Sequence, residues 1–223
     1  MTPRIRVKIC CIGSAEEAAL AIGAGADALG FVAALPSAPG PLDDERIRAM
    51  AAAVPPPIAT FLLTARMTGP EIADHLDVCR TSTVQVVDHV DPSHWAPIAA
   101  RHPGVRRVQV IHVEGPEALD LIPRYAAHVH AFLLDSGKPG GTMRELGGTG
   151  RTHDWQVSRA FVVASPLPVF LAGGLTPANV GEAIATVRPF GVDLCSGVRT
   201  DGRLDRAKLE AFMAAVRAAE RAS

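Results

Sequence analysis

Short apolar runs alternate with longer Ala-rich segments along the whole chain. Runs of this kind are typical of strands that are buried on both faces of a parallel sheet. The third run follows Pro55-Pro56-Pro57, which cannot continue the helix before it. Eight runs are predicted to be strands: Val7–Cys10, Ala28–Ala33, Ile58–Leu63, Val84–Val87, Val105–Ile111, Ala131–Leu134, Pro168–Leu171 and Gly191–Leu194.

The segments between these runs carry the signals of helix ends. Ser14 precedes two glutamates, which is the pattern of an N-cap with acidic residues in the first turn. Thr176 before Pro177 predicts another helix start. The amphipathic segment Leu204–Arg221 predicts the closing helix, with an apolar face formed by Leu209, Phe212, Met213 and Val216.

Eight strands that alternate with helices in 223 residues predict a single α/β domain, residues 1–223, folded as a closed (β/α)₈ TIM barrel. An open, doubly wound sheet is the alternative, but it rarely holds eight βα units in so short a chain. The long irregular stretch Ser136–Thr152 is rich in glycine and forms the loop after strand six in a barrel. Its length makes it a candidate lid or binding loop.

The formal net charge of −1 argues against a general electrostatic attraction to nucleic acid or to an anionic membrane. The four cysteines include no Cys-x-x-Cys pair and no His-rich spacing, so neither a disulfide framework nor a zinc site is predicted. No segment approaches the ~18 uninterrupted apolar residues of a membrane helix, and the N-terminus lacks the apolar core of a signal peptide. We therefore expect a cytoplasmic protein.

Glycine-rich turns follow the last two predicted strands, Gly173 and Gly174 after strand seven and Ser196 and Gly197 after strand eight. Barrel sites lie at the carboxyl ends of the strands. Glycine lets the backbone approach a ligand closely, and the N-terminus of a short helix adds free N–H groups. Tight turns would explain either pair alone, but both pairs at adjacent strand ends predict a phosphate-binding site.

Two side chains with acid–base chemistry stand at other strand ends. Asp135 follows an apolar run, and partial burial would raise its pKa and suit it to act as a general acid. A loop-capping aspartate is the alternative. Cys10 ends strand one, where a small buried hydrophobic residue is the alternative. Lys8 shares a strand face with Cys10, so an inward-pointing Cys10 would have an ammonium group nearby. The other three cysteines are expected to be structural.

Several motifs resemble the phosphoribosylanthranilate isomerase family of tryptophan biosynthesis. The resemblance covers nearly the whole chain and is strongest in its second half. Any one motif would be weak evidence, whereas their occurrence in the family's order is specific. The motifs are Lys8-Ile9-Cys10, residues 24–31, Leu133-Leu134-Asp135, residues 147–150, His153-Asp154-Trp155, residues 171–180 and residues 191–198.

The resemblance implies a (β/α)₈ barrel that carries out an Amadori (aldose-to-ketose) rearrangement of an N-(5-phosphoribosyl) amine, without a metal or another cofactor. It implies that Asp135 protonates the furanose ring oxygen as general acid. It also implies that the Cys10 thiolate removes the proton from the second carbon of the sugar. Gly173, Gly174, Ser196 and Gly197 would hold the phosphate.

The chain departs from the family pattern in three places. Cys11 stands where family members have glycine, and Val84–Asp88 differs from the usual Val-Gln-Leu-His-Gly. After strand two, Leu35–Pro41 lacks the arginine that contacts substrate in the family. Loss of such a charge-assisted bond typically removes ~1.5–3 kcal/mol. The departures therefore question anthranilate as the aglycone of the substrate. They favour a relative of the family that acts on a different aglycone.

Lys8, Arg66 and Asp193 are further candidates for contact with the substrate, although a solvated surface position is the alternative for Arg66. Seven histidines are expected on the surface or in loops: His89, His94, His102, His112, His128, His130 and His153. The predicted partner is a small phosphoribosyl compound, with no nucleic acid and no membrane, and the protein is expected to be a monomer or homodimer.

A phosphate-binding or regulatory barrel that has lost turnover is the alternative function. The presence of both Cys10 and Asp135 weighs against it, because a protein without turnover has no need of the pair. A metal-dependent sugar-phosphate epimerase is disfavoured, since its metal-ligating His and Asp residues at strand ends are not evident.

Overall fold

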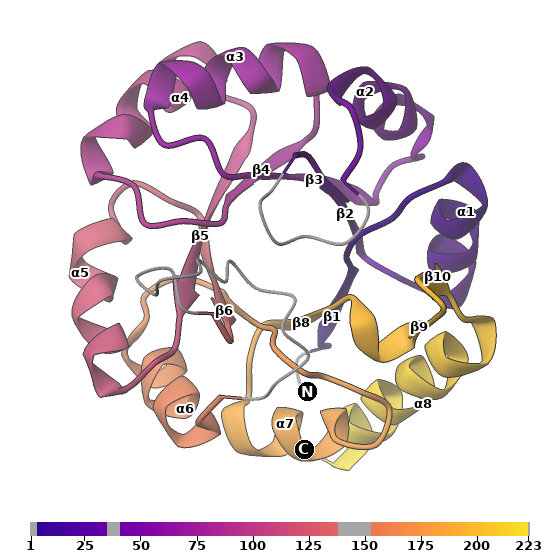
Figure 1. Ribbon diagram of the computed structural model, residues 1–223. Coiled ribbons are helices and arrows are strands. Elements are labelled where there is room, and N and C mark those ends of the chain that lie inside the picture. Colours follow the sequence, from indigo (N-terminus) through magenta and orange to yellow (C-terminus); the bar gives the residue numbers. More distant parts are fainter. Residues whose placement is uncertain (1–3, 35–40, 138–152, 223) are drawn as a thin grey trace.

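The predicted barrel is confirmed by the computed structural model, which describes residues 4–34, 41–137 and 153–222 (Figure 1). Each strand pairs in parallel with the next, and β8 closes onto β1 with Lys8 beside Asp193. The strands are β1 (Arg6–Ile9), β2 (Ala28–Val32), β3 (Ala59–Thr64), β4 (Thr83–Val86), β5 (Arg106–His112), β6 (Ala131–Asp135), β7 (Val169–Leu171) and β8 (Gly191–Leu194).

The helices form a ring around the strands (Figure 1). They are α1 (Ala15–Ala24), α2 (Asp44–Ala53), α3 (Gly69–Cys79), α4 (Trp95–Arg101), α5 (Leu121–Tyr125), α6 (Trp155–Ala164), α7 (Val180–Val187) and α8 (Arg206–Ala222). In the part of the chain that the structure describes, the connections include three 3₁₀ helices and a short hairpin: η1 (Pro92–His94), η2 (Pro116–Asp120), η3 (Ser196–Val198), β9 (Arg199–Thr200) and β10 (Arg203–Leu204).

The sequence signals for two of these helices are confirmed. The Ser14 side chain caps α1 by accepting a hydrogen bond from the backbone N–H of Glu17 at 3.2 Å. The predicted apolar face of the closing helix is buried in α8. This helix begins at Arg206 rather than Leu204, because Leu204 pairs with Arg199 in the short hairpin.

The prediction that a helix starts at Thr176 and Pro177 is wrong, because α7 begins at Val180. The side chain of Asn179 accepts a hydrogen bond from the backbone N–H of Thr176 at 2.8 Å. This bond closes a turn ahead of the helix.

The strands divide their side chains between two apolar cores. Ala28 and Val32 of β2 belong to the cluster inside the barrel, whereas Leu29 and Phe31 pack outward against the helices. This alternation follows from the period of two along a strand. It makes every second residue of each strand a potential lining residue of the barrel.

The loop after β6 that was predicted as a lid falls on residues 138–152, and most of the loop after β2 falls on residues 35–40, both outside the described residues. Within the described ranges, no helix combines the length and the apolar character needed to cross a bilayer.

Candidate active site

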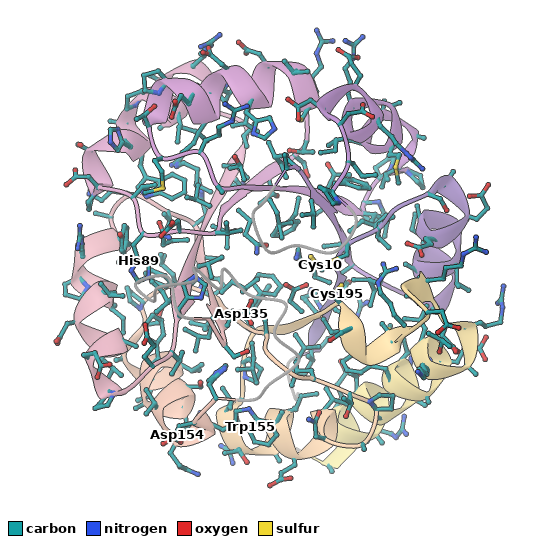
Figure 2. All side chains as sticks on the ribbon, in the orientation of Figure 1. Cys10, His89, Asp135, Asp154, Trp155 and Cys195 are labelled. Carbon is teal, nitrogen blue, oxygen red and sulfur yellow. The ribbon has the colours of Figure 1, made fainter. Side chains whose placement is uncertain are left out.

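Cys10 lies at the carboxyl end of β1 with its side chain in the inner core of the barrel. Its backbone N–H donates a hydrogen bond to the carbonyl of Leu194 on β8 at 2.8 Å. The residue is only 6% exposed. Figure 2 shows Cys10, Cys195 and Asp135 within the ring of strands. The thiol therefore occupies the mouth of the barrel, where the sequence analysis placed it.

Lys8 and Asp193 form a buried ion pair inside the barrel. The Lys8 Nζ lies 2.8 Å from the Asp193 Oδ1, and the Lys8 side chain is fully buried. Burial alone would lower the pKa of Lys8. The nearby Asp193 carboxylate and the Cys10 side chain outweigh burial and raise its pKa above the ordinary value. Lys8 is thus held as an ammonium group inside the barrel.

Gly30 in β2 makes room for this arrangement, although the sequence analysis did not single it out as a site residue. A Cβ atom at Gly30 would lie 2.8 Å from the Cys10 Sγ and 3.1 Å from the Lys8 Nζ. The thiol and the ammonium group therefore converge on the space that a side chain at position 30 would fill. A glycine in the middle of an apolar strand was the available signal, since it often marks a close approach.

Asp135 ends β6 at the same mouth, and the residue is half-buried. Burial raises the pKa of Asp135 above its ordinary value. The backbone N–H of Ser136, which donates a hydrogen bond at 2.7 Å to the Asp135 Oδ1, and the charge of His112 act against this rise. The charge of Asp193 also raises the pKa of Asp135, and the charge of Lys8 lowers it. Asp135 and the ion pair are thus electrostatically connected.

His112 ends β5 beside Asp135, and its prediction as a surface or loop residue is wrong. It pairs with Asp135 in the strand register and is 4% exposed. One of its ring nitrogens, Nε2, lies 2.9 Å from the Val87 carbonyl oxygen. The alternation with Val108 and Val110, which face the barrel interior, was the sequence signal that places His112 inside.

Two further cysteines, Cys11 and Cys195, lie close to Cys10. All three are free cysteines. Cys11 has a φ angle of 61°, a left-handed conformation that non-glycine residues rarely adopt. Hydrogen bonds with the thiols of Cys10 and Cys195 are the largest cause that raises the pKa of Cys11. The hydrogen bond with Cys11 and the charge of Arg199 lower the pKa of Cys195 despite its burial. Cys11 and Cys195 thus belong to the site rather than to the outer core.

Arg199 joins the loops after β1 and β8. Its guanidinium group donates hydrogen bonds to the carbonyls of Cys10 and Cys11 and to the Glu17 carboxylate. Glu17 also accepts a hydrogen bond from the backbone N–H of Gly13 at 2.9 Å. These contacts hold the backbone that carries Cys10 in one position.

The loop after β7 has the open backbone expected of a ligand-binding turn. Gly173 and Gly174 adopt φ angles of 85° and 61°. A Cβ at Gly173 would lie 3.0 Å from the Ser136 Oγ and 3.1 Å from the His153 Nδ1. The Asn179 side chain donates a hydrogen bond to the Gly174 carbonyl at 2.9 Å. The turn is therefore fixed from both sides.

The loop after β8 packs directly against the loop after β7. A Cβ at Gly197 would collide with the carbonyl of Leu175, so only glycine permits this contact. Ser196 is exposed and begins the short helix η3, which the sequence analysis expected after strand eight. The four predicted phosphate-binding residues thus lie on two loops that touch.

Among the contacts of the described residues, none joins Arg66 to the residues at the barrel mouth. Its side chain is exposed after β3, and its charge acts on Glu71 in the first turn of α3. Lys8 and Asp193, the other two candidates for contact with substrate, pair with each other inside the barrel.

The mouth therefore combines a thiol beside an ammonium group, a carboxyl group whose burial favours the protonated form, and two touching glycine loops. One acid and one base are what a proton transfer between neighbouring sugar carbons and the ring oxygen needs. The glycine loops supply backbone groups for an anionic handle, which would hold the sugar between acid and base.

Known proteins of one family are similar to this chain over most of its length. The family model of N-(5'-phosphoribosyl)anthranilate isomerase matches residues 7–215. The enzyme of that name from Methanocella arvoryzae is 35% identical over 89% of this chain and 91% of its own length. Its counterpart from Halobacterium salinarum is 38% identical over 94% of each chain.

Solved structures with the same description superimpose on the whole barrel. The phosphoribosyl anthranilate isomerase from Thermococcus kodakaraensis has a TM-score of 0.79 and is 33% identical, over 96% of this chain and 99% of its own. Another solved structure, also described as a phosphoribosyl anthranilate isomerase, is a complex with reduced 1-(o-carboxyphenylamino)-1-deoxyribulose 5-phosphate. It has a TM-score of 0.79 and is 26% identical over 96% of this chain and 99% of its own.

Proposed function

The chain belongs to the N-(5'-phosphoribosyl)anthranilate isomerase family, and from this premise we propose that Cys10 is the general base and Asp135 the general acid of its aldose-to-ketose rearrangement. The protein is an isomerase of tryptophan biosynthesis that acts on a small-molecule substrate. The assignment of the two residues is our own and rests on their position.

The observation that carries the assignment is the buried Lys8–Asp193 ion pair, which is electrostatically connected to both residues. Lys8 is influenced by the side chain of Cys10, and the pKa of Asp135 responds to both Asp193 and Lys8. The Lys8 Nζ and the Cys10 Sγ converge on the same space beside Gly30, so the ammonium group lies next to the thiol proposed as base. The Asp193 charge favours a proton on Asp135, as burial does. The pair therefore supports one group as base and the other as acid.

The acid step begins the reaction. Asp135 donates its proton to the furanose ring oxygen, and the bond between that oxygen and the first sugar carbon breaks. The electron pair of the amine nitrogen forms the double bond of an open-chain Schiff base. Burial of Asp135 supports this role, because a raised pKa keeps more of the carboxyl group protonated.

The base step follows on the open chain. The Cys10 thiolate takes the proton from the second sugar carbon, and the electron pair moves toward the cationic nitrogen to give an enol-amine. The first carbon then gains a proton and the hydroxyl on the second carbon loses one, which yields the 1-amino-1-deoxyketose. The acid acts at the ring oxygen and the base at the second carbon, so the two groups need to lie on different sides of the sugar. Positions at the ends of β1 and β6 can supply this arrangement.

We assign the substrate phosphate to Gly173, Gly174, Ser196 and Gly197. The contact between the loops after β7 and β8 and the positive φ angles of Gly173 and Gly174 support this assignment. A phosphate held there fixes one end of the sugar, so that the acid and base act on a positioned substrate.

The family favours anthranilate as the aglycone over the different aglycone that the sequence departures suggested. The relatives compared above carry the anthranilate name, and one structure holds an analogue with a carboxyphenyl group. We expect a monomer or a homodimer that works in the cytoplasm. The free thiols of all four cysteines support a reducing compartment.

The test is a coupled fluorescence assay with N-(5'-phosphoribosyl)anthranilate generated in situ. We expect turnover by the native protein, and a loss of about 10²–10⁴-fold or more in kcat for both Cys10→Ala and Asp135→Asn. Cys79→Ala, which removes a thiol far from the mouth, should retain activity within a factor of about three. Turnover that persists in Cys10→Ala or Asp135→Asn would refute the assignment, and its absence in the folded native protein would refute anthranilate as the aglycone.

A further inference from the structure

A second group of metal-ligating side chains lies outside the barrel, between α2 and α3. Asp44, His75 and Cys79 each offer one ligand atom, and these three atoms lie within 4.8 Å of one another. The two helices are neighbours at the rim of the molecule (Figure 1). The group takes no part in the rearrangement proposed above, because it lies on the opposite side of the sheet from the barrel interior.

Two of the ligands come from one helix face. His75 and Cys79 are four residues apart in α3, and both are buried. Residues at this spacing lie one turn apart on the same side of a helix. The third ligand, Asp44, is the first residue of α2, and its side chain is 37% exposed. The group is therefore anchored by a rigid helix and open to solvent at one corner.

The imidazole of His75 is already oriented for coordination. Its Nε2 faces the Asp44 Oδ1 at 3.0 Å, and its Nδ1 lies 2.9 Å from the Thr64 Oγ1 at the end of β3. Metal-bound histidines characteristically use their second ring nitrogen in a hydrogen bond that fixes the ring. Thr64, which is fully buried, supplies that partner here.

The charge around the group favours a cation. The Cys79 thiol is fully buried, and no hydrogen bond of its sulfur is seen among the described residues. Burial, Asp44 and Glu45 raise the pKa of Cys79 to about 12. Burial is the largest cause of this rise, and the negative charges of Asp44 and Glu45 add to it. The same two carboxylates attract a cation, which on binding replaces the thiol proton.

We propose that Asp44, His75 and Cys79 bind a divalent transition-metal ion of the zinc type. One sulfur, one nitrogen and one carboxylate oxygen form a donor set that Zn²⁺ accepts, with water as the fourth ligand. Tetrahedral coordination at ordinary Zn²⁺ bond lengths separates ligand atoms by about 3.3–3.8 Å, so the present spacing needs only side-chain adjustments. On binding, Cys79 loses its proton to solvent and the ion joins α2 to α3.

The sequence analysis predicted no zinc site because the ligands lie on two helices. Asp44 precedes His75 by 31 residues. Only the packing of α2 against α3 brings them together. The His75–Cys79 spacing alone is too common in helices to indicate a metal.

The probe is Co²⁺, added to the intact protein after treatment with a chelator. We expect saturation at one equivalent, visible absorption bands of tetrahedral cobalt, a near-ultraviolet thiolate-to-cobalt band, and displacement of all bands by Zn²⁺. The thiolate band should vanish in Cys79→Ala and His75→Gln, and persist in Cys11→Ser and Cys195→Ser, which alter thiols at the barrel mouth. Zn²⁺ should also raise the unfolding midpoint of the native protein but not that of Cys79→Ala.

Asp44→Asn tests the site without disturbing the core, because Asp44 is partly exposed. It should fold as the native protein does and bind Co²⁺ at least tenfold more weakly. No thiolate band in the native protein, a band that survives in Cys79→Ala, or a band lost in Cys11→Ser would overturn the proposal. None of these readouts depends on isomerase activity.

Discussion

The two halves of the barrel mouth differ in the side chains they direct inward. Strands β6, β8 and β1 contribute Asp135, Asp193 and Lys8, with Cys10 above them. Strands β2, β3 and the end of β4 contribute Val32, Leu63 and Val87, which belong to one apolar cluster. The acid, the base and the ion pair thus occupy one half. Of the three departures from the family pattern, those after β2 and around β4 belong to the other half, and Cys11 alone lies beside the base.

The largest effect is expected from breaking the ion pair in the charged half. Lys8→Met leaves the Asp193 carboxylate buried without its partner, which typically costs about 3–5 kcal/mol. We expect the urea midpoint to fall accordingly, and Lys8→Met/Asp193→Leu to recover part of the loss. Arg206→Met, which opens an exposed pair with Glu210, should leave the midpoint nearly unchanged. Equal effects of the two substitutions would contradict a structural role for the buried pair.

A methyl group added at Gly30, between the two halves, should lower activity without a matching loss of stability. In Gly30→Ala the new Cβ falls 2.8 Å from the Cys10 Sγ and displaces the base. Displacement by about 1 Å can reduce kcat about 10²-fold. Gly23→Ala in α1 places its Cβ where nothing lies within 4 Å, so steady-state assays should show normal kcat. Normal kcat in Gly30→Ala would show that the Cys10 position is not critical.

The glycine loop of the charged half offers a smaller effect on substrate affinity. Gly173→Ala strains a φ angle of 85° and crowds Ser136, so we expect KM to rise about tenfold with kcat less affected. Gly202→Ala imposes similar strain at a φ angle of 75° with nothing within 4 Å of its Cβ. It should lower stability without raising KM. A rise in KM for both variants would mean that strain, rather than phosphate contact, is responsible.

The smallest expected effect is on the pH dependence of stability. One histidine from each half of the mouth contributes to it. Burial lowers the pKa of His153, beside the β7 loop, and of His89, after β4, from 6.5 to about 4. Between these values the unfolded chain takes up protons that the folded chain does not, so stability falls as pH drops from 6.5 to 4. His153→Gln and His89→Gln should each flatten this decline in urea titrations. An unchanged slope would show that these histidines are protonated in the folded protein.

Much of the site could be predicted from the sequence because barrel topology assigns strand ends to one face. The apolar runs located the strands, and the positions of Cys10, Asp135 and the glycine pairs followed from them. The period of two along β1 also predicted that Lys8 and Cys10 share one strand face, and in the structure both side chains converge beside Gly30.

What the sequence could not supply were relations between distant strands. Lys8 and Asp193 are 185 residues apart, and only the closure of β8 onto β1 sets them side by side. The convergence of Asp44, His75 and Cys79 likewise depends on helix packing. Each of these two features needs a register or a packing contact that no local pattern encodes. His112 is a different case, because its alternation with Val108 and Val110 indicated an inward position that the sequence prediction overlooked.

The central claim is that Cys10 takes the proton from the second sugar carbon. The direct measurement is the single-turnover rate with substrate that carries deuterium at that carbon, compared with unlabelled substrate. We expect a several-fold slower rate for the deuterated substrate in the native protein, and no detectable turnover in Cys10→Ala. Equal rates for the two substrates, together with turnover in Cys10→Ala, would contradict it.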